Sequence, residues 1–406
     1  MEPALPHAPT VIVGGARTPT GRFLGALKDL SATDLAAVAI RRALETSGLQ
    51  GADVDHLILG QVLQAGSGQN PARTAGLKAG LPAHIPSITI NKVCLSGINA
   101  IATADQMIRA GDADIVIAGG TESMSNSPHI LPRSRDGFRY GEATLVDSMA
   151  YDALYDQATQ QGMGSLAEGY NCAHGNSVSR TEQDRFAAQS HQRAAAAQAK
   201  GLFDDEIAPV SVPQRNGDPV LVTMDQGVRA DTTVEELSAL RPAFWPNGTI
   251  TAGSSSQISD GAAVVVVASA EAASKHGLPV LAEILSLGQV AGPDSSLQLQ
   301  PANAIKKALE KASLTAADLD LIELNEAFAL IGIESSRALG VPEAKTNVNG
   351  GAIAIGHPLG ASGARITLHL ALELARRGGG LGAAALCGGG GQGDALILRV
   401  PHRANV

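Results

Sequence analysis

The sequence predicts an α/β protein built from two similar α/β/α layered halves, with a loop domain inserted into the first half. An internal repeat is the first observation behind this prediction. Residues 39–59 and 304–324 align at a constant offset of 265 without a gap, and 10 of the 21 aligned positions are identical. Each copy reads as an amphipathic helix, a short loop with the pattern Ala-Asp-x-Asp and an apolar strand.

A second pair of similar segments extends the repeat. Residues 85–120 run strand, turn, helix and strand, and residues 344–391 do the same with extra residues in the turn. Ser96-Gly97 and Ser362-Gly363 open the corresponding helices. Duplication of an α/β unit therefore predicts two halves that pack against each other.

Between the repeats the chain has a different texture, because Gly, Pro and Ser clusters interrupt short elements. A helical pattern at 181–201 and an apolar strand at 262–268 are the clearest elements near this stretch. We predict three domains: an N-terminal half at 1–123 with a return segment at 250–275, an inserted loop domain at 124–249, and a C-terminal half at 276–406.

Composition limits the class of protein. The chain has 406 residues, of which 44% are hydrophobic, 17% charged and 3% aromatic, with 46 glycines. This is globular composition with close packing and tight turns. A net charge of −9 argues against a nucleic-acid partner. No secretory signal pattern and no run of membrane-spanning length occurs, so we predict a soluble cytoplasmic protein with no membrane partner. Three cysteines without CxxC spacing argue against a disulfide framework or a zinc site.

Candidate chemistry begins at Cys94, which sits at a strand-to-helix turn. A helix N-terminus lowers a thiol pKa, although a small buried thiol is the plainer interpretation. His357 occupies the matching turn of the second copy, and Cys387 ends a strand before four glycines. Equivalent turns of a duplicated fold lie at the same sheet edge, so we expect the three side chains to converge. A Cys–His pair activates a sulfur nucleophile, and a second thiol can act as acid or base.

The glycine-rich loops do not favour a nucleotide site. The segment GGGGQGD lacks the Lys-Ser/Thr of a phosphate loop, and no GxGxxG opens a helix after a strand.

Four blocks carry a family resemblance: NKVCLSG at 91–97, NEAFA at 325–329, NVNGGAIAIGHPLGASGAR at 347–365 and CGGGGQG at 387–393. In this order they resemble the signature blocks of the thiolases, and the resemblance runs from about Thr10 to Arg399. It implies a Claisen condensation of two acetyl-CoA to acetoacetyl-CoA and CoA, and the reverse thiolysis. It also implies a homo-oligomer, with a tetramer preferred over a dimer, and no cofactor or metal beyond the CoA thioesters.

The resemblance assigns roles to the residues found above. Cys94 is the acylated nucleophile, His357 takes its proton, and Cys387 is the acid/base at the α-carbon. Asn325 holds a water that forms one oxyanion hole with His357, and the N–H groups of Cys94 and Gly389 form the other. The implied CoA and substrate contacts are Arg229, Ser256, Ala252, Phe244, Met163, Phe328 and Leu154.

Two departures from the family pattern bear on specificity. Gly162-Met163 stands where short-chain members often have His-Met, and Leu95 stands where a small residue is common, so Leu95 is expected to narrow the space beside Cys94. A degradative 3-ketoacyl-CoA thiolase of broader chain length is the alternative. A ketoacyl-synthase-type condensing enzyme and a non-catalytic acyl-binding protein are less favoured, because Asn325 and Cys387 are both present.

Overall fold

The computed structural model describes residues 9–402 and confirms the layered α/β architecture. One ten-stranded mixed sheet runs through both halves in the order β14-β15-β16-β13-β1-β12-β5-β3-β4, with β2 added to β12. The first-half strands are β1 Thr10–Arg17, β2 Gly21–Arg22, β3 His56–Gly60, β4 Ser87–Ile90, β5 Ile115–Ser123 and β12 Ser259–Ser269. The second-half strands are β13 Ala282–Ala291, β14 Leu321–Leu324, β15 Gly380–Gly388 and β16 Gln392–Val400. β1 joins the halves by pairing with β13 over three residues.

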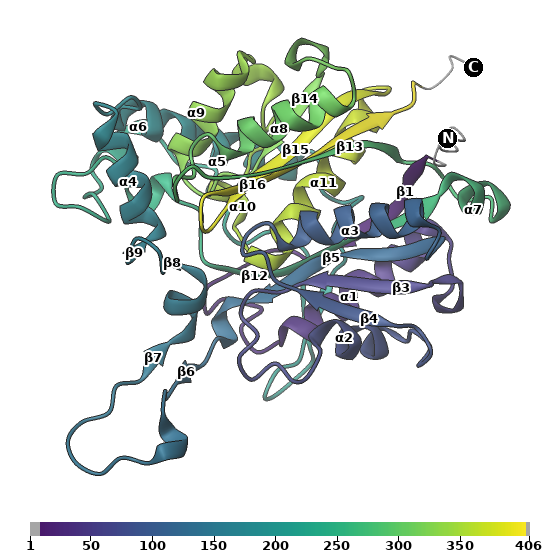
Figure 1. Cartoon of the computed structure of the whole chain (residues 1–406), viewed down its shortest axis with the longest axis horizontal. Helices are drawn as coiled ribbons and strands as arrows, with labels where there is room; N and C mark the ends of the chain where they lie inside the picture. The colour runs from purple at the N-terminus through teal and green to yellow at the C-terminus, as the bar shows by residue number, and fades with distance from the viewer. Residues whose placement is uncertain (1–8, 403–406) are drawn as a thin grey trace, which may run out of the picture.

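Helices form the outer layers and the centre of the molecule (Figure 1). The helices α3 Ser96–Ala110 and α11 Leu359–Arg376 lie between the two parts of the sheet and pack on each other. On the far side of the first half lie α1 Ala32–Ser47 and α2 Pro71–Ala79, and on that of the second half lie α8 Gln300–Lys311 and α9 Ala329–Leu339. The largest buried apolar cluster gathers around α3 and α11, so the two central helices form the core that unites the halves.

The duplication is visible in strand register. β3 pairs in parallel with β5 in the first half, and β14 pairs in parallel with β15 in the second half. The two copies of the repeat thus form equivalent strand pairs. Leu59 faces Gly119 in the first half, while Leu324 faces Ala385 in the second. The offset between β5 and β15 is therefore 266, and Thr121 is the first-half counterpart of Cys387.

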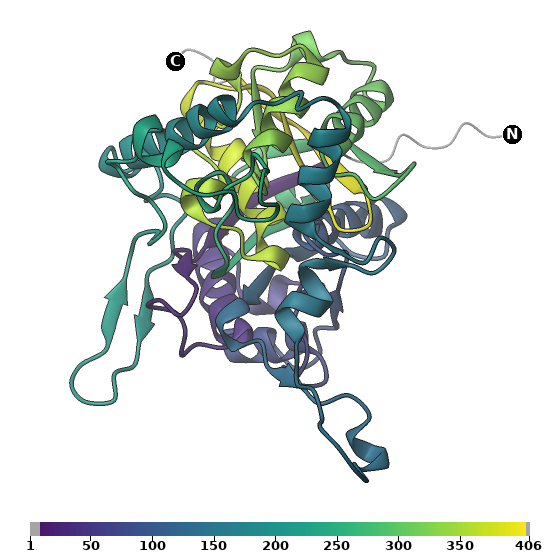
Figure 2. The same cartoon turned by 90° about the vertical axis from the view of Figure 1, so that its left-hand side faces the viewer.

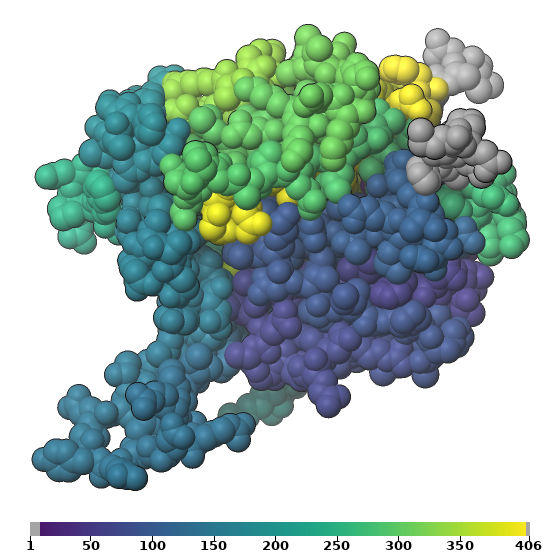
Figure 3. All heavy atoms as spheres, in the orientation of Figure 1, coloured from purple at the N-terminus to yellow at the C-terminus, as the bar shows by residue number. Residues whose placement is uncertain are grey.

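Residues 124–249 add short elements around this frame. Their strands pair only among themselves, as β6 His129–Ile130 with β7 Val146–Asp147, β8 Tyr155–Asp156 with β9 Gln161–Gly162, and β10 Val210–Val212 with β11 Val220–Val222. Their helices are α4 Met163–Ala173, α5 Arg180–Ala199 and α6 Val234–Ser238. Figure 2 shows that the β10–β11 hairpin and the arm that carries β6 and β7 project from the body, and Figure 3 shows the second arm in space-filling form.

Local sequence explains where the repeated helices begin and end. Ser31 caps α1 in a reciprocal capping box with Asp34, and Gly48 ends the helix with a φ of 75°.

No helix among residues 9–402 combines the length and apolar character needed to cross a bilayer.

Candidate active site

Cys94 lies in a tight turn between β4 and α3. Val93 has a φ of 51°, and Ser96 braces the turn by accepting from Lys92 N–H at 2.8 Å and donating to Val93 O at 2.6 Å. Lys92 Nζ also lies 2.7 Å from the buried carboxylate of Asp394 in β16. The turn that carries the thiol is therefore fixed both internally and to the second half.

The expected lowering of the Cys94 thiol pKa by the helix N-terminus is wrong for this structure. Burial and the charge of Glu122 together raise the pKa of Cys94 to about 12. The backbone N–H groups of Cys94 and Gly389 lie near the sulfur and oppose this rise in pKa, without reversing it. Cys94 precedes the N-cap residue Leu95, so its sulfur gains less from the helix than it loses by desolvation. The thiol is protonated at rest and requires a base.

His357 presents a neutral imidazole with a defined tautomer. Ser362 donates its hydroxyl proton to Pro358 O at 2.9 Å, so the Ser362 oxygen can only accept from Nδ1–H of His357, 2.6 Å away. Nε2 therefore carries the free lone pair. Burial and the charge of Arg365 lower the pKa of His357 to about 3, which keeps the ring neutral until it receives a proton.

The side-chain amide of Asn325 lies next to Nε2 of His357. Its Nδ2 lies 3.3 Å from His357 Nε2, while its Oδ1 is buried without a hydrogen-bond partner in the described part of the chain. The backbone N–H of Asn325 donates to Ala385 O at 3.0 Å, so the residue belongs to the same strand edge as Cys387. An unsatisfied buried acceptor next to Nε2 is the feature expected of a water or substrate oxygen site.

Cys387 ends β15 and is buried. Burial raises the pKa of Cys387, and the nearby Cys94 adds to this rise. Gly389, two residues later, directs its N–H at the Cys94 sulfur. The sequence GGGG is required in part by Leu95: a β-carbon on Gly388 would lie 2.6 Å from Leu95 Cγ.

The structure thus assembles the predicted catalytic residues as two sets. Cys94, Cys387 and Gly389 form one, and His357 and Asn325 form the other. Within residues 9–402 no hydrogen bond joins His357 to Cys94, so any proton transfer between them occurs once substrate is present.

The predicted acyl-end contacts lie beside these sets. Leu154 packs with Cys94 in one apolar cluster, and Met163 packs with Phe328 and Cys387 in another. The backbone N–H of Met163 donates to Leu154 O at 2.9 Å, which joins the two clusters.

The remaining predicted contacts are less closely connected to these two sets. The Phe244 ring meets Phe328 edge to face with centroids 5.8 Å apart, and Ser256 N–H donates to Ala327 O at 2.9 Å. Ala252 and Arg229 are exposed. The N–H of Arg229 donates to His191, and no described contact joins the Arg229 side chain to Phe244 or Met163.

Leu95 is fully buried among residues of the central helices, in the same apolar cluster against which Cys94 packs, and it contacts Gly388. Gly162, by contrast, has an ordinary extended conformation, and a β-carbon there would approach only Leu154 O, at 3.7 Å.

Two residues of the site were not identified from sequence. The sequence marks Ser362 only as the start of a helix, and no local pattern distinguishes Glu122 from other acidic residues. Glu122 is fully buried and accepts three backbone N–H bonds, from Val62, Leu63 and Gly360.

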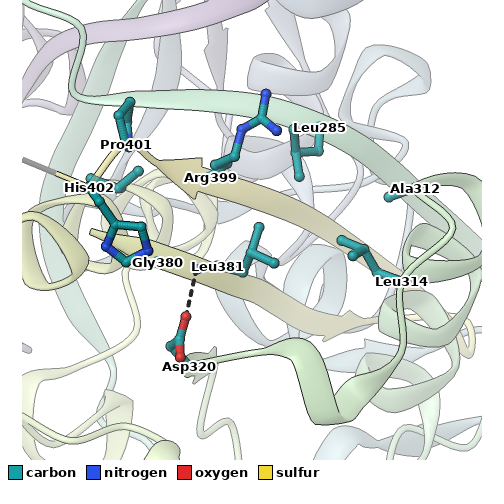
Figure 4. Close-up of a pocket in the computed structure, with 10 residues that line it drawn as sticks. Leu285, Ala312, Leu314, Asp320, Gly380, Leu381, Arg399, Pro401 and His402 are labelled. Atoms are coloured by element: carbon teal, nitrogen blue, oxygen red, sulfur yellow. Dashed lines mark hydrogen bonds between the residues drawn. The ribbon is translucent and has the colours of Figure 1, made fainter. Parts of the chain in front are cut away.

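One surface recess lies away from these residues. This recess of about 540 Å³ is bordered by β13, β15 and β16 (Figure 4). On its wall, the carboxylate of Asp320 accepts a hydrogen bond of 2.9 Å from Leu381 N–H. None of the predicted site residues lines it.

Comparisons with known proteins agree with the geometry. The family profile described as "Thiolase, N-terminal domain" matches residues 10–271, and "Thiolase, C-terminal domain" matches residues 278–400. The chain is 60% identical over 389 residues, 96% of this chain and 100% of the relative, to a Mycolicibacterium smegmatis protein named "Probable acetyl-CoA acetyltransferase".

Two solved structures are also similar. The acetyl-CoA acetyltransferase of Bacillus anthracis matches with a TM-score of 0.93 at 38% identity, covering 97% of this chain and 99% of that one. Human mitochondrial 3-ketoacyl-CoA thiolase matches with a TM-score of 0.92 at 42% identity, with the same coverage.

Proposed function

The chain belongs to the thiolase family, and from that premise we propose that it joins two acetyl-CoA into acetoacetyl-CoA and CoA, and runs the reverse thiolysis, through an acyl-Cys94 intermediate. The observation that carries the proposal is the pairing of a protonated, partly buried Cys94 thiol, which lies near the Gly389 N–H, with a His357 imidazole whose Nε2 faces Asn325. The names of the relatives support acetyl-CoA as the substrate.

The first half-reaction acylates Cys94. The sulfur attacks the thioester carbonyl carbon of acetyl-CoA while its proton passes to His357 Nε2. The carbonyl oxygen becomes an oxyanion, which the N–H groups of Cys94 and Gly389 stabilise. When the carbon–sulfur bond to CoA breaks, the CoA sulfur takes the proton from His357, and acetyl-Cys94 remains. A high thiol pKa and a low imidazole pKa require this proton to move together with the attack.

The second half-reaction forms the carbon–carbon bond. Cys387 passes its proton to His357 Nε2, and the resulting thiolate removes the α-proton of a second acetyl-CoA. The enolate oxygen is held by His357 Nε2–H and a water on Asn325. The α-carbon attacks the acetyl-Cys94 carbonyl, the carbon–sulfur bond breaks, and the Cys94 sulfur takes its proton from His357 Nε2. In thiolysis Cys387 instead donates its proton to the departing carbanion, a role that its raised pKa favours.

The CoA chain enters along the inserted segment. Leu154, Met163 and Phe328 enclose the acyl end, Phe244 and Ser256 line the pantetheine arm, and Ala252 and the exposed Arg229 lie toward the nucleotide. The reaction needs no metal or prosthetic group, because the thioester itself activates the carbonyl and the α-carbon.

Acyl chain length divides this proposal from the degradative alternative. The experiment is thiolysis of 3-ketoacyl-CoAs of four, six, eight and twelve carbons, compared by kcat/KM. Preference for the four-carbon substrate supports the short-chain enzyme. A maximum at eight or more carbons would instead indicate a 3-ketoacyl-CoA thiolase, and release of carbon dioxide from malonyl-CoA would indicate a ketoacyl synthase.

Self-association accompanies the activity. β4 is an edge strand whose Ile88 is exposed, and the arm between β6 and β7 carries exposed Phe138, Tyr140 and Leu145 (Figure 3). Apolar edges and arms of this kind are typical of interfaces between copies of one chain. We expect a tetramer by light scattering, and dimers after deletion of residues 131–145; a monomeric full-length chain would contradict this.

A further inference from the structure

Glu122 joins the two halves directly beneath the candidate site. It is the penultimate residue of β5, and its side chain is completely buried. Oε2 accepts from Val62 N–H at 3.0 Å and from Gly360 N–H at 2.9 Å, and Oε1 accepts from Leu63 N–H at 3.0 Å. Val62 and Leu63 follow β3 of the first half, whereas Gly360 lies in the first turn of α11 in the second half. One carboxylate therefore holds a loop of one half and a helix N-terminus of the other.

The surrounding backbone is packed too closely to move independently. A β-carbon on Gly360 would lie 2.5 Å from Thr121 O and 2.6 Å from Gly60 O, and one on Gly97 would lie 2.6 Å from Gly360 O. The first turns of α3 and α11 are thus in direct backbone contact at Gly97 and Gly360. Cys94 stands three residues before the first of these glycines and His357 three residues before the second, so this contact governs the spacing of thiol and imidazole.

We propose that Glu122 is a positioning residue that holds the His357 turn against the Cys94 turn through the N–H of Gly360, and so sets how the imidazole approaches the thiol. The inference rests on the proposed function, since it concerns proton transfer from Cys94. The Glu122 carboxylate also stabilises α11, because a negative charge at a helix N-terminus interacts favourably with the helix dipole.

The charge of Glu122 disfavours ionisation of the Cys94 thiol, whereas its hydrogen bonds hold the thiol and the imidazole in place. Burial raises the pKa of Glu122 to about 7, although its three N–H donors lower it and Asp260 raises it. Glu122 in turn raises the pKa of Cys94, whose other titratable neighbour is Cys387. Removing the charge should make the thiol more acidic, whereas loosening the contact should slow the reaction. A residue with only a structural role would not produce these two opposite effects.

The test is Glu122→Gln in the full-length protein. The amide would place an NH₂ group against one of the backbone N–H donors, so one of the three bonds is lost. We expect kcat for acetoacetyl-CoA thiolysis to fall about 10- to 100-fold, with KM within about threefold of the wild type. Alkylation of Cys94 by iodoacetamide, followed by peptide mapping against pH, should show a midpoint lower by about half a unit or more.

Glu168→Gln is the matched control. Glu168 is also buried and accepts from the backbone N–H groups of Thr249 and Ile250, both at 2.8 Å, but it lies on α4. Its loss should cost comparable stability without moving the Cys94 alkylation midpoint. If Glu122→Gln does not fold, Glu122→Asp keeps the charge and withdraws the carboxylate, so kcat should fall while the midpoint is not lowered.

The outcomes separate this inference from the proposed function. A wild-type protein that forms no acetyl-Cys94 from acetyl-CoA would refute the proposed function. A wild type that does form it, together with a Glu122 variant whose kcat is within twofold or whose alkylation midpoint is unchanged, would refute the positioning role alone.

Discussion

The Ser362 hydroxyl lies 2.6 Å from Nδ1 of His357 and decides which imidazole nitrogen is free. Because that hydroxyl already donates to the backbone at Pro358, Nδ1 must carry a proton and Nε2 must accept. The serine comes from α11 and the histidine from the turn before it, so the six residues 357–362 contain both the base and the group that orients it. The free Nε2 faces Asn325, which is where the proposed chemistry needs it.

Ser362→Ala should therefore slow the enzyme without weakening substrate binding. The imidazole would lose its tautomer preference and one buried hydrogen bond. We expect kcat to fall about 10-fold, equivalent to roughly 1.4 kcal/mol in the barrier, with KM little changed. Steady-state kinetics of thiolysis measure both parameters.

Ser335→Ala provides the comparison for that variant. Ser335 is equally buried and donates to Gln298 O at 2.8 Å, away from the imidazole. A similar loss of thermal stability with unchanged kcat would place the effect of Ser362→Ala on the imidazole. An equal fall of kcat in both variants would show that any buried hydroxyl matters.

Cys387→Ala should separate the two half-reactions. Cys94 and its N–H donors are untouched, so acetylation by acetyl-CoA continues, while the proton transfer at the α-carbon is lost. Condensation and thiolysis should fall about 10²- to 10⁴-fold. Rapid-quench measurement of acetyl-enzyme beside steady-state turnover tests this, and loss of acetylation itself would mean that Cys387 has another role.

Gly162→His should fold normally and shift the preference toward shorter chains. Gly162 has φ −68° and ψ 149°, which any residue adopts, and its β-carbon position is open except for Leu154 O. An imidazole there would fill space beside Leu154 and Met163. The ratio of kcat/KM for four- and eight-carbon 3-ketoacyl-CoAs should rise at least several-fold. An unchanged ratio would place the chain-length determinant elsewhere.

Acid should destabilise the protein partly through His357. The pKa of this histidine is about 3 in the folded protein and near 6.5 in the unfolded chain. Between those pH values the unfolded state therefore binds one proton more than the folded state. The free energy of unfolding consequently falls as pH is lowered below about 6.5. Glu122, whose pKa is raised to about 7, opposes the trend but is common to the wild type and the variant.

His357→Asn isolates that contribution. The melting temperature of the variant relative to the wild type should rise as pH is lowered from about 7 to 5, because the variant lacks the proton-binding penalty. Differential scanning calorimetry at several pH values provides the comparison. A difference that stays constant over this range would contradict a buried neutral His357.

Much of this architecture follows from the sequence because duplication repeats it. The repeat at 39–59 and 304–324 predicted the equivalent helices and strands, and the turns at Cys94 and His357 marked one sheet edge. Sequence alone misjudged groups whose environment comes from elsewhere in the chain. The Cys94 pKa depends on burial and on the charge of Glu122. Glu122 and Gly360, which form a hydrogen bond, are 238 residues apart in sequence, so no local pattern predicts their contact.

The most direct test of the account is to mix the protein briefly with acetyl-CoA, quench it in acid and map its peptides by mass spectrometry. We predict an acetyl adduct on the peptide that contains Cys94, formed within one turnover and absent from Cys94→Ala. Free CoA should appear in equal amount. Binding of CoA with no adduct on Cys94, or an adduct on Cys172 or Cys387 instead, would contradict the assignment of the nucleophile.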